Sequence, residues 1–137
     1  MPQLQRSVAA LRIGGDGLVP EEISKMMGSA PSRAHREGEK FGGSDGLRNE
    51  RKSGQWSLEA TDREPENFDR QINEILSKLT DDLAVWARVR ASYEVDLFCG
   101  WFMGSSDEGI DVSPENLKAL GDRGIKLSIC MYAPSKG

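Results

Sequence analysis

The run EVDLFCGWFMG, Glu94–Gly104, is the most apolar stretch of the chain and constrains the fold more than any other segment. It alternates as a strand does, and one face carries Val95, Leu97, Cys99, Trp101 and Met103. A strand with one solvent face should carry polar residues on the other side. This strand instead places Phe98 and Phe102 there, so both of its faces are expected to be at least partly covered.

The rest of the chain reads as three further strands and three helices. Apolar alternation predicts strands, and cap signals with a 3.6-residue apolar period predict helices. The expected strands are 7–13, 54–60, 92–103 and 125–132, and the expected helices are 20–27, 65–90 and 113–123. The helix over 65–90 has an alternative reading, in which it breaks at Thr80-Asp81-Asp82 and restarts.

This order places two β-α-β halves, 7–60 and 92–132, on either side of a long connecting helix, 65–90. Such a pattern is typical of an α+β, ferredoxin-like two-layer sandwich with a four-stranded, mainly antiparallel sheet. A chain of 137 residues is the usual size of one domain with one core. We therefore expect 1–137 to form a single domain.

Residues 29–53 show no periodic pattern and are predicted to form a long loop. The segment is rich in glycine, serine and charge, with six basic and four acidic residues in a chain whose net charge is −4. Loops of this length in compact domains are usually either functional or disordered. We therefore expect residues 29–53 either to contribute to function or to be disordered.

Composition excludes several classes of protein. A net charge of −4 and a pI of about 5.1 argue against general nucleic-acid binding and against attraction to an anionic membrane. No apolar run is long enough to span a bilayer, and the first residues lack a signal-peptide core, so a cytoplasmic location is expected. Cys99 and Cys130 fall out of phase on their strands, which predicts free thiols; no metal or cofactor is expected.

Several phrases in combination resemble one bacterial family, catalogued as domain of unknown function four-two-seven-nine. They are RIGGDGLVPEEISKMMG, PSRAHREGE, GQWSLEA, EVDLFCGWF and SPENLKALGDRGIKLSI, and the resemblance spans residues 7 to 132. It implies a small, self-contained bacterial α+β protein. It brings no catalytic residues and no substrate, and an immunity-type role beside a toxin is one hypothesis that it raises.

The glycines Gly14, Gly15 and Gly17 lie between a predicted strand and the start of a predicted helix. Backbone N–H groups at such a place can hold a phosphate. The pattern G-G-x-G is neither a P-loop nor a dinucleotide fingerprint, and a tight turn explains it more simply.

His35 is the only histidine, and its neighbours include Arg33 and Arg36. General-base catalysis needs an orienting partner and a nucleophile, which the local sequence does not supply. A solvent-exposed loop histidine is the simpler reading. The functional alternative is that Arg33, His35 and Arg36 recognise an acidic partner or a phosphate.

Phe98 and Phe102 have three possible covers: the 65–90 helix, a second copy of the chain, or a partner or ligand. The absence of a catalytic constellation favours a non-catalytic protein-interaction module, of the immunity type or otherwise. Its partner would be another protein or a second copy, bound by the second sheet face and the 29–53 loop. The alternative function is a small-molecule or anion-binding protein, or a weak enzyme, with a pocket near Gly14–Gly17, His35 and Trp56.

Overall fold

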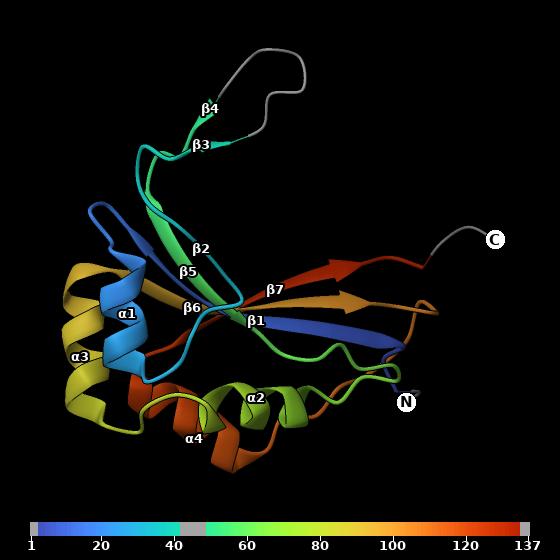
Figure 1. The fold of residues 1–137 in the computed structure, drawn as a ribbon. Helices are drawn as coiled ribbons and strands as arrows, with labels where there is room; N and C mark the ends of the chain where they lie inside the picture. Colours follow the sequence, from blue (N-terminus) through green and yellow to red (C-terminus); the bar gives the residue numbers. More distant parts are fainter. Residues whose placement is uncertain (1–2, 42–48, 135–137) are drawn as a thin grey trace.

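The computed structural model describes residues 3–41 and 49–134, which form one mixed sheet with helices on one side and a small projecting ribbon (Figure 1). The helices are α1 (Pro20–Met27), α2 (Phe68–Ser77), α3 (Leu83–Ser92) and α4 (Pro114–Arg123). The strands are β1 (Arg6–Gly15), β2 (Arg33–His35), β3 (Lys40–Phe41), β4 (Asn49–Glu50), β5 (Gly54–Glu59), β6 (Glu94–Phe102) and β7 (Lys126–Tyr132).

The main sheet has five strands in the order β2-β5-β1-β6-β7. The central strand β1 pairs antiparallel with both β5 and β6, and β2 pairs antiparallel with β5. Strand β7 pairs parallel with β6, as a right-handed crossover through α4 requires. The α+β class is therefore confirmed, with four helices in the described residues and a five-stranded mixed sheet.

The expected four-stranded, ferredoxin-like arrangement is corrected by strand β2. Strand β2 runs in the same direction as β1, and α1 connects the two, so this is the true β-α-β unit of the first half. The chain then turns back and enters β5, which lies between β1 and β2 and runs the opposite way. In the second half β6 and β7 are direct neighbours, whereas a ferredoxin-like sheet would place another strand between them.

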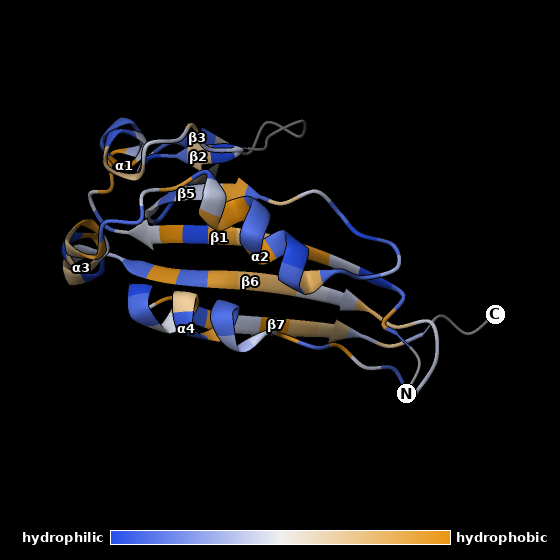
Figure 2. Cartoon of the chain, turned by 90° about the horizontal axis from the view of Figure 1, so that it is seen from below, coloured by the Kyte–Doolittle hydropathy of each residue, from blue (hydrophilic) through white to orange (hydrophobic). Residues whose placement is uncertain are grey.

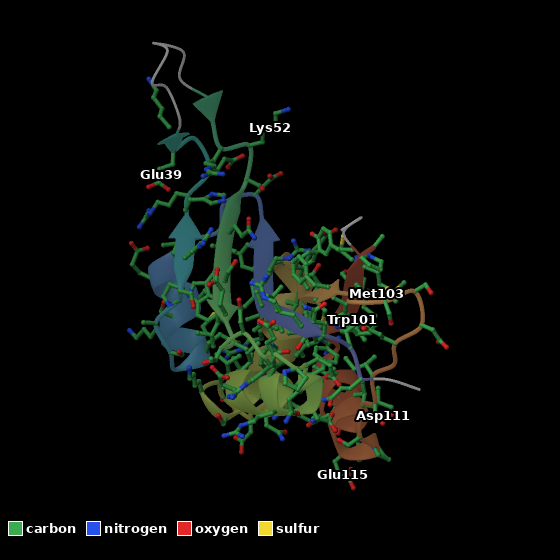
Figure 3. All side chains as sticks on the ribbon, turned by 90° about the vertical axis from the view of Figure 1, so that its right-hand side faces the viewer. Glu39, Lys52, Trp101, Met103, Asp111 and Glu115 are labelled. Carbon is green, nitrogen blue, oxygen red and sulfur yellow. The ribbon has the colours of Figure 1, made fainter. Side chains whose placement is uncertain are left out.

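Most of the difference between the expected and the observed topology lies in segment 29–53, which we expected to be a loop without secondary structure. It supplies β2 and the two-stranded β3–β4 ribbon, which projects from one end of the sheet (Figure 1). Backbone bonds continue between these elements, with Gly38 N donating to Arg51 O at 2.8 Å and Arg51 N donating to Glu39 O at 2.8 Å. In Figure 3, Glu39 and Lys52 mark the base of this ribbon. Residues 42–48 lie outside the described part of the chain.

The expected helix 65–90 is two helices, which confirms the alternative with a break at 80–82. Asn67 caps α2 by accepting a hydrogen bond from Arg70 N at 3.1 Å, and Asp82 caps α3 by accepting from Ala84 N at 3.0 Å. A side chain that satisfies a free N–H at a helix start stabilises that start. Asp82 therefore fixes the start of α3 after α2 has ended at Ser77, at a position that a purely apolar pattern passes over.

The core fills the space between the sheet and the helices. Alternate residues of β1, namely Ala9, Leu11 and Ile13, are buried, while the residues between them are half-buried. The same alternation is visible as orange and blue bands along β1 and β6 in Figure 2. Among the largest side chains that are fully buried are Trp56, Phe68, Ile72 and Trp86.

Two polar residues, Gln71 of α2 and Ser7 of β1, are fully buried in this core and bond each other. The amide of Gln71 is the centre of the network. Its Oε1 accepts from Ser7 Oγ at 2.7 Å, and its Nε2 donates to Ser7 O at 2.9 Å and to Thr61 O at 3.0 Å. Buried polar groups must find partners inside the protein, because an unpaired one carries the full cost of lost hydration. Gln71 therefore holds α2 to β1 and to the segment that follows β5.

We expect Gln71→Leu to lower the free energy of unfolding by about 1–3 kcal/mol, because it leaves the buried Ser7 hydroxyl and two carbonyls without these partners. Asn73→Leu is the matched control, since Asn73 is exposed on the same helix and its change should stay within about 0.5 kcal/mol. Urea unfolding of both variants is the measurement. An equal stability of Gln71→Leu and the wild type would contradict a role for this network.

Candidate functional site

The side of the sheet opposite the helices is the candidate functional surface, and we call it the open face. In Figure 1 all the helices lie on the other side of the sheet. Strand register and alternation place the following residues on the open face: Arg33 and His35 of β2; Gln55, Ser57 and Glu59 of β5; Arg6, Val8, Ala10 and Arg12 of β1; Glu94, Asp96, Phe98, Gly100 and Phe102 of β6; and Lys126, Ser128, Cys130 and Tyr132 of β7. The face has a polar end near Arg33 and an aromatic end near Tyr132.

A polar row crosses all five strands at one end of the open face. The register pairs Arg33 with Ser57, Ser57 with Arg12, Arg12 with Asp96, and Asp96 with Lys126. Five residues that are spread over most of the sequence therefore lie side by side.

Arg12 and Asp96 form the centre of this row. The Nε and Nη2 atoms of Arg12 donate to the two carboxylate oxygens of Asp96 at 2.8 and 2.6 Å, and Ser128 Oγ donates to Asp96 Oδ2 at 3.2 Å. The hydrogen bond to Asp96 raises the pKa of Arg12 above its usual value. Two parallel bonds fix the guanidinium plane, so this geometry orients Arg12 as well as neutralising it.

Arginines of β1 cover both phenylalanines of the open face. The guanidinium carbon of Arg12 lies 4.7 Å from the centre of the Phe98 ring, and that of Arg6 lies 4.7 Å from the centre of the Phe102 ring. These are cation–π distances. The reading in which the 65–90 helix covers the rings is wrong, because α2 and α3 pack on the other side of the sheet.

Tyr132 extends the aromatic end onto the edge strand. Its ring stacks on Phe102 with centroids 4.6 Å apart and an angle of 10° between the planes, and the residue is 42% exposed. Gly100 lies beside this pair, where a Cβ atom would come within 2.7 Å of Val8 Cγ2. A larger residue at Gly100 would push Val8 or the stacked rings away, so the glycine keeps this part of the surface closely packed.

Two cavities lie at the polar end of the open face. One, of about 330 Å³, lies over β2, β5 and β1, and Arg12, Arg33 and His35 contribute to its lining. The other, of about 460 Å³, reaches Glu94 and Lys126. Arg12 and Gln55 line both cavities, so the two are neighbours along the same end of the sheet.

The structure brings together only some of the predicted binding residues. Arg33 and His35 share the open face with Phe98 and Phe102, whereas the Nη2 atom of Arg36 bonds Glu21 Oε2 of α1 at 2.7 Å. Trp56 is fully buried on the helix side, where its Nε1 donates to Ser24 Oγ at 3.0 Å. The expected pocket that joins His35 to Trp56 therefore does not form.

Two of the three predicted glycines stay together. Gly14 and Gly15 line a cavity of about 500 Å³ beside Asp16, whereas Gly17 has φ +72°, a left-handed conformation that suits a turn. Helix α1 begins nearby without a side-chain cap and has Glu21 and Glu22 in its first turn. Carboxylates there compete with any anion for the helix N-terminus. Anion binding by Gly14, Gly15 and Gly17 stays a prediction.

The open face also carries four residues that were not predicted from the sequence to belong to a site: Arg6, Arg12, Lys126 and Tyr132. The signal for the arginines was present, because Arg6 and Arg12 lie on β1 in the phase opposite to the apolar Leu11 and Ile13. The partners of these arginines could not be predicted from this pattern, because the register between β1 and β6 decides which side chains lie opposite each other.

The imidazole of His35 lines the 330 Å³ cavity, and its Nδ1 is buried without a hydrogen-bond partner among the described residues. An orienting carboxylate at that nitrogen is what a general base usually has. In the described part of the chain, no cluster of three or more His, Cys, Asp or Glu side chains has the geometry of a metal site. None of the helices in residues 3–41 and 49–134 is long and apolar enough to cross a bilayer.

Both cysteines are free, as the strand phase predicts. Cys99 belongs to β6, and its side chain is fully buried in the core. Burial, with a smaller contribution from Asp96, raises the pKa of its thiol to about 12. A thiol that stays protonated at neutral pH is a poor nucleophile. Cys99 therefore acts as an apolar core side chain.

The raised pKa of Cys99 predicts a loss of stability at alkaline pH. Its folded pKa of about 12 exceeds the ordinary value of 9.0, so above pH 9 the unfolded chain releases this proton while the native protein holds it. The stability from this group is complete below pH 9 and falls as the pH rises, by about 1.4 kcal/mol at pH 10. Cys99→Ala should lack this component, and urea unfolding of both proteins at pH 7.5 and 10 measures it. An identical pH dependence in the two proteins would contradict the assignment.

Comparison with known proteins gives a family but no relative of known activity. No curated protein and no solved structure has significant similarity to the chain. A family model described as "Domain of unknown function (DUF4279)" matches residues 4–134, nearly the whole sequence, as the resemblance implied. The chain therefore belongs to the DUF4279 family.

Proposed function

We propose that this protein is a non-catalytic interaction module that binds another protein through its open face. The observation that carries the proposal is the aromatic end of that face, where Phe98, Phe102 and Tyr132 lie on the uncovered side of the sheet beside Arg6 and Arg12. The core on the helix side does not need these residues, so their chemistry calls for another explanation.

The residue types of the open face support a protein partner. Aromatic residues and arginine are enriched at protein interfaces and contribute most of the residues whose truncation costs much affinity. Here the two types occur as stacked pairs, with Arg6 on Phe102 and Arg12 on Phe98. Such pairs offer a partner flat apolar rings and hydrogen-bond donors at the same place.

The ion pairs of the open face hold these groups in place before binding. Arg12 is fixed by two bonds to Asp96, and the Nη2 atom of Arg6 donates to Asp62 Oδ2 at 2.7 Å. Side chains that are already ordered lose less conformational entropy when a partner arrives. These ion pairs therefore support the proposal that the face is ordered before a partner binds.

The partner that fits this face presents an apolar patch with a carboxylate nearby. The rings supply the apolar centre, and Lys126 at the polar end forms no ion pair with any described residue. Charge complementarity at such a rim improves the rate and the specificity of association. The immunity-type role raised by the family resemblance is one member of this class and stays a prediction.

We expect the double variant Phe98→Glu/Phe102→Glu to fold normally and to lose its partner. The fold should survive because both rings lie outside the helix-side core, while two buried carboxylates would disrupt an apolar interface. The measurement compares stoichiometric capture from native cytosol by the tagged wild type and by the variant, with circular dichroism of each as a check of the fold.

Leu117→Glu is the control, because Leu117 is 53% exposed on α4, in the helix layer. It should capture the same protein as the wild type. Equal capture by the wild type and the double phenylalanine variant would exclude the open face as the binding surface. If light scattering shows that the wild type is a homodimer and the double variant is a monomer, the partner of the open face is a second copy of the chain.

A further inference from the structure

The polar end of the open face has a charge balance that differs from that of the whole protein. The chain has 18 basic and 22 acidic residues. The 330 Å³ cavity at the polar end is lined by three arginines, Arg12, Arg33 and Arg51, and by one carboxylate, Glu59. Positive charge is therefore concentrated at one place on an acidic protein.

The 330 Å³ cavity over β2, β5 and β1 is rich in hydrogen-bond donors. Its polar lining includes Arg12, Arg33 and Ser57, and Glu59 is its only carboxylate among the described residues. Arg12 already bonds Asp96, and Arg33 already pairs with Glu59, so an anion in the cavity competes with a carboxylate for each guanidinium. A guanidinium can bind phosphate through two parallel bonds. The cavity is also at the small end of the volume range for small-molecule sites, which begins at roughly 300 Å³.

Arg33 is the residue best placed to change partners. Its Nε lies 3.2 Å from Glu59 Oε1, and the two side chains are 82% and 45% exposed. A surface ion pair of this kind contributes little to stability because water competes for both groups. A ligand with a higher charge can therefore take the guanidinium of Arg33 from Glu59 at small cost.

We propose that this cavity binds the phosphate group of a small phosphorylated molecule, with Arg33 and Arg12 as its cationic ligands and Glu59 as the competing carboxylate. A phosphate monoester carries about −1.5 to −2 charges at neutral pH and three acceptor oxygens, which suits two arginines and the Ser57 hydroxyl. Arg12 is shared with the aromatic end, where it covers Phe98, but Arg33, Ser57 and Glu59 belong to the cavity alone. The phosphate site therefore adds a ligand to the proposed protein interaction and does not rest on it.

Inorganic phosphate is the first probe, titrated into ¹⁵N-labelled wild type at constant ionic strength and followed by amide chemical shifts. The expected shifts are centred on residues 33–35, 55–59 and 10–12, which border the cavity. Arg33→Gln should weaken binding about tenfold, because a charge-assisted bond is lost. Glu59→Gln should strengthen binding, because it removes the competitor of phosphate for Arg33.

Arg36→Gln is the matched control. Arg36 lies three residues from Arg33 and also forms one surface ion pair, but that pair is with Glu21 of α1 and Arg36 does not line the cavity. It removes the same charge and should change the affinity less than twofold. Equal weakening of phosphate binding by Arg33→Gln and Arg36→Gln would show only a general attraction of phosphate to positive charge, and it would overturn the site. Wild-type amide shifts that are absent, or that are centred on other residues, would also overturn it.

Two phosphate monoesters then identify the source of the phosphate. Ribose 5-phosphate should bind more tightly than O-phosphoserine if the ligand is a small metabolite. The reverse order would assign the cavity to a phosphorylated side chain of a partner and would overturn the small-molecule proposal. Phe102→Glu changes the aromatic end but leaves Phe98 and Arg12 in place, so this single variant should still bind inorganic phosphate. Failure of the phosphate site and failure of the protein-interaction proposal are therefore distinguishable.

Discussion

Burial of every second side chain of β1 is the constraint on which the rest of the structure depends. Strand β1 is central, so its buried face sets where the helices must pack, and Ala9, Leu11 and Ile13 all point to the same side. The four helices in the described residues therefore lie in one layer, and Gln71 fixes the position of α2 within it. No helix covers the other side of the sheet in the described residues, so the side chains there contact only each other and solvent.

On that other side, ion pairs and aromatic rings replace a second layer of helices. The rings of Phe98 and Phe102 are half-buried by arginines of the neighbouring strand, and Asp96 fixes one of those arginines with two hydrogen bonds. A long arginine side chain covers apolar area with its stem while its charged end stays in water. An apolar strand face can thus be tolerated in solution and still be ready for contact with a partner.

The elements with a clear apolar period could be predicted from the sequence, including the strands around Leu11, Leu58 and Leu97 and the helix that Ser113 caps. Strand β2 could not, because an exposed edge strand has no buried face, and Arg33, Ala34 and His35 are polar or small. Missing this strand changed the predicted topology of the first half. The cover of Phe98 was also out of reach, since Arg12 lies 84 residues from Asp96 and only the strand register brings them together. Trp56 was placed near a pocket only in the alternative function; it shares the phase of Leu58, and the structure places both side chains in the core.

The central position of β1 also has a consequence for how the chain folds. The first strand of the sequence receives one neighbour from residues 54–59 and the other from residues 94–102. Contacts between segments so far apart require the closure of long loops, which slows folding in comparison with helical bundles. During synthesis, β1 must keep an unpaired edge until β6, residues 94–102, has been made. A truncated chain that ends before β6 would retain that exposed edge of β1. Chaperone binding to nascent chains should therefore be strongest before β6 has been synthesised.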